Sequence, residues 1–110
     1  MVHRLVVSYG QPQDPAAFDA YYRDTHTPLA LQQPGVLRLT FGHPRSLDPS
    51  QAAPYLVAEL DFESQQAMNE TLASPEGRAA GKDIANFATG GATMVHYELQ
   101  EVQAGIPQMP

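Results

Sequence analysis

The sequence predicts a two-layer α+β sandwich in which helices cover one face of an antiparallel sheet. Two observations support this prediction. Four segments alternate apolar and polar residues with the period of a strand, and two longer segments repeat apolar residues every three to four positions, as amphipathic helices do. The segments follow one another in the order β-α-β-β-α-β, which is typical of a ferredoxin-like fold.

Length and composition fit one small domain. The chain has 110 residues, of which 43% are hydrophobic, and this is enough for a single modest core. We expect one domain over residues 1–102, followed by a tail over residues 103–110. Cysteine is absent, which excludes a disulfide framework, a thiolate nucleophile and a Cys-ligated metal site.

The charge of the chain narrows the classes of partner. The formal net charge is −6 at pH 7 and the six Lys and Arg residues are scattered, so we expect no binding to nucleic acid or to an anionic membrane. No apolar run approaches the ~20 residues that span a bilayer. The N-terminal residues alternate like a strand and do not resemble a signal peptide, so a cytoplasmic location is expected.

The first strand is predicted over residues 3–9, which are rich in β-branched side chains and end at Gly10. A helix is predicted to begin at Pro15, because Asp14 before it is a favourable N-cap and proline suits the first helical position. This helix is expected to reach about Leu31, shortly before a Pro-Gly turn.

The first helix combines a buried face with a histidine. At about 100° per residue, His26 falls at the seam of that face, so it is expected to be half-buried beside a cavity. Pro28 lacks a backbone donor and is expected to kink or end the helix near Thr27. The predicted buried face consists of Phe18, Tyr21, Tyr22, Thr25 and Leu29.

The middle of the chain predicts two strands, over residues 36–43 and 55–63. The loop over residues 44–54 between them is rich in proline and long for a hairpin. Such a loop is suited to act as a mobile lid, although loops of this kind are more often variable surface.

The second helical region is predicted in two pieces. Ser64 caps a helix over residues 65–73, and Ser74 with Pro75 marks the start of another. A Gly-Gly pair ends this region, and the last strand is predicted over residues 92–102.

A sheet with helices on one side leaves its other face uncovered. Pairs such as Tyr55 with Val57, or Val95 with Tyr97, give the strands apolar content on the alternate face. Because an exposed apolar patch of that size is unfavourable, we expect two sheets to pair in a homodimer.

Two segments resemble the signatures of the EthD family, named after ethyl tert-butyl ether degradation. Residues 18–30, FDAYYRDTHTPLA, with the following Pro-Gly, resemble the first signature. The second signature is matched by Ser74-Pro75-Glu76-Gly77, Ala79-Ala80, Asp83, Asn86-Phe87 and Gly90-Gly91. The resemblance extends to about Val102.

This resemblance implies a dimeric α+β barrel, in which two ferredoxin-like sheets close around a central cavity. The broader superfamily includes cofactor-free monooxygenases, polyketide cyclases, decarboxylases, lactone isomerases and haem enzymes. The resemblance therefore implies the fold more strongly than the reaction.

His26 is the first candidate for catalysis, because imidazole can act as a general acid or base near neutral pH. Tyr22, on the same side of the helix, is the candidate helper that orients His26 or donates a hydrogen bond to a carbonyl or phenolate. The alternative is that His26 only caps a carbonyl at the helix end.

Four further residues are candidates for ligand binding: Tyr21, Asn86, Phe87 and Gly90. Tyrosines at helical spacing are more often core residues. Asn and Gly after a helix more often serve its C-terminus, although glycine also permits a close approach of backbone to ligand.

The remaining titratable groups give weaker signals. The histidines at positions 3, 26, 43 and 96 lie on four different predicted elements and have no metal-binding spacing, so no metal is expected. Glu59 and Asp61 share a strand face and are expected to be solvated edge residues, unless a closed cavity raises one pKa.

The leading hypothesis is an EthD-like homodimer that binds a small apolar or aromatic, oxygen-bearing metabolite. It would catalyse acid–base chemistry of an oxidation, cyclisation or decarboxylation type without a cofactor. The alternative is a non-enzymatic binding or accessory protein of an oxygenase pathway, and a third possibility is haem chemistry through a single histidine.

Overall fold

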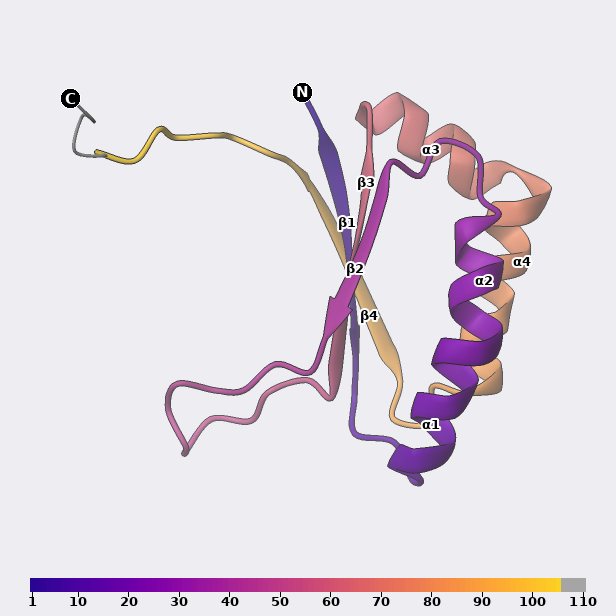
Figure 1. The fold of residues 1–110 in the computed structure, drawn as a ribbon, viewed down its shortest axis with the longest axis vertical. Helices are drawn as coiled ribbons and strands as arrows, with labels where there is room; N and C mark the ends of the chain where they lie inside the picture. Colours follow the sequence, from indigo (N-terminus) through magenta and orange to yellow (C-terminus); the bar gives the residue numbers. More distant parts are fainter. Residues whose placement is uncertain (106–110) are drawn as a thin grey trace.

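A computed structural model describes residues 1–105 of the chain, and the last five residues of the predicted tail lie outside this description. One antiparallel sheet has the strand order β2-β3-β1-β4, and all helices lie against one of its faces (Figure 1). The predicted ferredoxin-like α+β fold is confirmed. The strands are β1 (His3–Tyr9), β2 (Arg38–Gly42), β3 (Leu56–Phe62) and β4 (Ala92–Glu98).

The helices form two groups that run antiparallel to each other on one face of the sheet (Figure 1). The first group is α1 (Pro15–Tyr21), the π-helical turn η1 (Tyr22–His26) and α2 (Thr27–Leu31). The second group is α3 (Gln65–Ala73), α4 (Pro75–Asp83) and the short 3-10 turn η2 (Ile84–Asn86).

The predicted helix starts are confirmed, because each depends on local chemistry. Asp14, Ser64 and Ser74 all have extended backbones, and each side chain accepts a hydrogen bond from the backbone N–H three residues later. This contact satisfies one of the amide donors that a helix leaves free in its first turn.

The predicted extent of the first helix, to about Leu31, is confirmed, and the irregularity expected near Thr27 is a π-helical turn rather than a helix end. The chain widens into the π-helical turn, in which the N–H of Thr27 donates to the carbonyl of Tyr22, and then continues as α2 to Leu31. The change of register accommodates the missing donor of Pro28 without ending the helix.

The wider turn also changes which side chains face inward. Tyr22, His26 and Ala30 are buried at intervals of four, whereas Thr25, expected on the buried face, is exposed. His26 is 5% exposed and is therefore buried, not half-buried.

The last strand is shorter than predicted and ends at Glu98. Its partner β1 begins at His3, which is paired with Glu98, and beyond this pair the N–H of Leu99 still donates to the carbonyl of Val2 at 2.9 Å. β2 likewise begins at Arg38, although the N–H of Leu37 still donates to the carbonyl of Asp61.

The core lies between the sheet and the helices. Leu5, Val7 and Tyr9 of β1 point into it, as the alternation predicts. From the other elements it receives Phe18, Tyr22, Leu56, Ala58, Leu60, Phe62, Met68 and Phe87.

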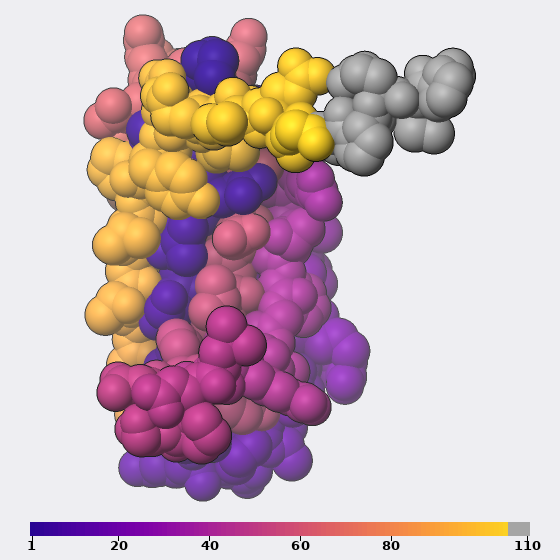
Figure 2. Space-filling view, turned by 90° about the vertical axis from the view of Figure 1, so that its left-hand side faces the viewer, coloured from indigo at the N-terminus to yellow at the C-terminus, as the bar shows by residue number. Residues whose placement is uncertain are grey.

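Within residues 1–105, no helix covers the opposite face of the sheet. Figure 2 looks onto this face and shows the strands between two segments: the loop that joins β2 to β3, residues 43–55, lies below, and the C-terminal segment, residues 99–105, lies above. Both segments project from this side (Figure 1), so the loop lies across the sheet from the core and does not cover it. Val95 and Tyr97 of β4 are 62% and 46% exposed on this face.

Candidate functional site

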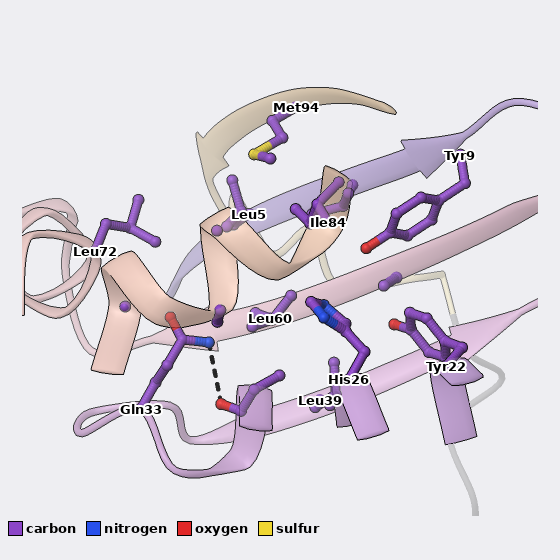
Figure 3. A pocket seen from close by; sticks show the side chains of 16 residues that line it. Leu5, Tyr9, Tyr22, His26, Gln33, Leu39, Leu60, Leu72, Ile84 and Met94 are labelled. Atoms are coloured by element: carbon purple, nitrogen blue, oxygen red, sulfur yellow. Dashed lines mark hydrogen bonds between the residues drawn. The ribbon is translucent and has the colours of Figure 1, made fainter. Parts of the chain in front are cut away.

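A small cavity of about 60 Å³ lies between the sheet and the helix layer of a single chain. Its wall contains residues from every strand and from both helix groups, and most of them are apolar (Figure 3). The polar side chains among the sixteen lining residues are Tyr9, Tyr22, His26 and Gln33. Two of these, His26 and Tyr22, are the predicted catalytic pair, and the structure brings both to this cavity.

His26 is held at one ring nitrogen by a carboxylate. Its Nδ1 lies 2.9 Å from Oδ2 of Asp83, the last residue of α4, and Asp83 is 7% exposed. This contact joins the first helix group to the second. It also replaces the alternative in which His26 caps a backbone carbonyl.

Asp83 is the centre of a larger network of hydrogen bonds. Its Oδ1 accepts from the hydroxyl of Tyr21 at 2.6 Å and from Nδ2 of Asn86 at 2.9 Å. Burial alone would raise the pKa of the Asp83 carboxyl, but the hydrogen bonds from Tyr21, Asn86 and His26 outweigh it and lower that pKa. Asp83 is therefore an ionised acceptor at neutral pH.

An ionised Asp83 fixes the tautomer of the neutral imidazole. Because the carboxylate can only accept, Nδ1 of His26 must carry the proton, and Nε2 keeps its lone pair. Within residues 1–105, Nε2 has no hydrogen-bond partner, while the ring lines the cavity. This arrangement suits the uptake of a proton from a molecule bound in the cavity.

Aromatic rings fix the position of the imidazole. The centroid of the His26 ring lies 4.7 Å from that of Phe87 and 5.4 Å from that of Tyr22. Phe87 itself is 5% exposed, so it supports His26 from within the core.

The four predicted ligand-binding residues lie outside the cavity wall. Tyr21 and Asn86 bind Asp83, and Phe87 packs behind His26. Gly90 does approach backbone closely, as only a glycine can, but this backbone belongs to Gly10 and not to a ligand. A Cβ on either glycine would overlap the other residue.

The remaining histidines do not join His26. His3 and His96 meet across β1 and β4, with Nε2 and Nδ1 2.8 Å apart, and His43 lies at the base of the 43–55 loop with Nδ1 2.8 Å from the Tyr55 carbonyl. Within the described residues, no group of three or more His, Asp or Glu side chains is arranged to hold a metal ion.

Asp61 is not a carboxyl with a raised pKa. Arg4 binds it through two hydrogen bonds of 2.7 and 3.0 Å and lies 3.7 Å from Glu59. The Arg4 hydrogen bond lowers the pKa of Asp61 and outweighs the effect of its burial.

Sequence reasoning missed two residues of this site, Asp83 and Tyr9. Asp83 belongs to the second signature and His26 to the first. The presence of both signatures in one sequence was the signal that could have linked the two residues. Tyr9 was placed on the inward face of the first strand, where a phenol among aliphatic side chains is a polar group that needs a partner.

Comparisons with known proteins agree with the signatures. Residues 10–91 match the EthD domain. A protein of Rhodococcus erythropolis, described as an uncharacterised 11.0 kDa protein in the thcB–thcC intergenic region, is 43% identical over 101 residues, which cover 92% of this chain and 98% of that protein.

Solved structures share the fold. An ethyl tert-butyl ether degradation (EthD) family protein of Bacillus halodurans is 30% identical, with a TM-score of 0.82 over 91% of this chain and 100% of that one. A dimeric ferredoxin-like protein of unknown function from Thermobifida fusca is 16% identical, with a TM-score of 0.67 over 90% and 92% of the two chains. The latter likeness concerns the fold alone. In the described part of the chain, no helix is both long and apolar enough to cross a membrane.

Proposed function

The chain belongs to the EthD family, and from this premise we propose that it binds a small apolar or aromatic, oxygen-bearing metabolite and transfers a proton from it. The site is the cavity between the sheet and the helices of one chain. His26 is the proton acceptor, and Tyr22 is a hydrogen-bond donor to the bound molecule.

One observation carries this proposal: the contact of 2.9 Å between the buried side chains of His26 and Asp83, beside an apolar cavity. A carboxylate that orients imidazole and stabilises its protonated form is a common device of general-base catalysis. The proton transfer requires no group beyond these two side chains.

The cavity wall supports the class of ligand. Most of the wall is apolar, so it favours a ligand whose surface is mainly apolar. The apolar side chains that surround the few polar groups include Leu5, Leu39, Leu60, Ile84 and Met94. The volume of about 60 Å³ suits a small molecule or one ring of a larger one.

A homodimer is part of the proposal. The uncovered sheet face exposes Val95 and Tyr97, and the 43–55 loop and the C-terminal segment project beside it (Figures 1 and 2). Pairing two such faces would remove the apolar side chains from water. The ligand cavity lies on the other side of the sheet, so each protomer would keep its own site.

Two substitutions separate binding from chemistry. A panel of small phenols, cyclic ketones and lactones serves as probes, with thermal shift for binding and chromatography for turnover. His26→Ala is expected to bind a probe nearly as well as the wild type and to lose turnover by at least about 100-fold. Gly81→Leu is expected to lose binding, because Gly81 lines the cavity and a large side chain there would compete with the ligand for its space.

The same panel tests the alternative of a non-enzymatic binding protein. The result would favour a non-enzymatic binding protein if His26→Ala weakens binding of the probe and the wild type turns over no probe. Undiminished binding to Gly81→Leu would place the ligand elsewhere and would contradict the proposed site.

A further inference from the structure

Two tyrosine hydroxyls at the cavity lack partners. Tyr9 and Tyr22 are 2% and 3% exposed, yet within residues 1–105 neither hydroxyl forms a hydrogen bond. The hydroxyls of Tyr21 and Tyr55, in contrast, donate to Asp83 at 2.6 Å and to Asp19 at 2.7 Å. The rings of both residues are buried, but neither hydroxyl oxygen is sealed off by protein atoms, so each is open to a partner in the cavity.

Both hydroxyls are directed at the place where the ligand is proposed to bind. Tyr9 ends β1 and Tyr22 begins η1, so different layers of the fold supply them. Their ring centroids are 5.7 Å apart at an interplanar angle of 77°. Figure 3 shows both hydroxyls turned toward the space beside the His26 ring, and all three side chains line the same cavity.

The protonation of these groups limits what they can do. Burial raises the pKa of Tyr22 to about 12 and also raises the pKa of Tyr9, so both phenols stay protonated at neutral pH. The amide nitrogen of Gln33 already donates to the carbonyl of Ala30 at 3.0 Å. Among residues 1–105, the cavity therefore offers two free tyrosine O–H donors next to the free Nε2 of His26.

We infer that Tyr9 and Tyr22 both donate hydrogen bonds to one oxygen of the bound molecule, and that this oxygen becomes negatively charged when His26 takes the proton. This inference rests on the proposed function and adds Tyr9 to the site. It also narrows the substrate class to phenols, enols or ketones with an acidic C–H bond beside the carbonyl. A molecule without such an oxygen would leave both hydroxyls unpaired.

The proton transfer balances without another reactant. The O–H or C–H bond of the substrate breaks, its proton bonds to Nε2 of His26, and its electron pair stays on the substrate as a phenolate or enolate. Two preorganised donors stabilise that oxyanion more than they stabilise the neutral oxygen, so they lower the free energy of the proton transfer.

Two probes of similar shape test the inference. Ionised 4-nitrophenol presents an oxyanion, whereas nitrobenzene lacks that oxygen. Tyr9→Phe and Tyr22→Phe are each expected to weaken binding of the phenolate about tenfold or more, as the loss of a hydrogen bond to a charged group does. Binding of nitrobenzene should stay within about twofold of the wild type, since the rings remain.

Tyr55→Phe is the matched control, because its hydroxyl binds Asp19 and does not line the cavity. It should bind both probes as the wild type does. Thermal unfolding gives a second readout: Tyr9→Phe should melt at the same or a higher temperature, because it removes a hydroxyl that forms no hydrogen bond within residues 1–105. A lower melting temperature, or equal weakening of both probes, would assign Tyr9 a structural role and overturn the inference.

The outcome for the wild type separates this inference from the proposed function. If the wild type binds neither probe, the proposed function fails and the inference fails with it. If it binds both and Tyr9→Phe retains the preference for the phenolate, the ligand site stands and the role of Tyr9 is refuted.

Discussion

Replacing Asp83 with alanine is expected to lower the free energy of unfolding by about 3 kcal/mol or more. The substitution removes the acceptor of three hydrogen bonds and leaves the donors of Tyr21, His26 and Asn86 without it. It also breaks the link between the two helix groups. Chemical denaturation of the variant and the wild type at pH 7 measures the loss.

The pH dependence of that loss is a sharper test. Because the folded-state pKa of Asp83 is below its ordinary value of 3.8, ionised Asp83 stabilises the fold above that value. This contribution is lost as the pH falls through the folded-state pKa. The difference in stability between wild type and Asp83→Ala should therefore shrink in acid. A difference that is equal at pH 7 and in strong acid would contradict the role of the ionised carboxylate.

Replacing Gly77 with alanine is the second change with a large expected effect. A Cβ at Gly77 would overlap the carbonyl oxygen of Thr71 and the backbone of Leu72. Backbone cannot move aside as a flexible side chain can, so α3 and α4 must separate. We expect a loss of about 3 kcal/mol in the free energy of unfolding.

Gly81 of the same helix supplies the matched control. A Cβ there meets nothing within 4 Å, so Gly81→Ala should stabilise α4 by up to about 1 kcal/mol through helix propensity. Equal effects of the two substitutions in chemical denaturation would contradict the close packing of α3 on α4.

Local chemistry explains which parts of the fold were predictable. The caps at Asp14, Ser64 and Ser74 depend on residues within one turn, and β1 and α3 have the predicted bounds. The end of β4 was not predictable in the same way, because it depends on where its pairing with β1 ends.

The site was predicted only in part, because some of its residues are neighbours in the sequence and others are brought together by the fold. His26 and Tyr22 share a helix, so one segment of sequence relates them. Asp83 lies 57 positions from His26, and only the fold brings the two together. The resemblance also implied a cavity between two sheets, whereas the cavity lined by His26 lies on the helix side of the sheet.

Native mass spectrometry with added 4-nitrophenol tests the central claim, that each chain contains its own ligand site. At saturating probe, we expect a particle of twice the mass of one 12.0 kDa chain with two probe molecules bound, and no bound probe for Gly81→Leu. A dimer that binds a single shared probe molecule, or equal binding to Gly81→Leu, would contradict a site between the sheet and the helices of each protomer.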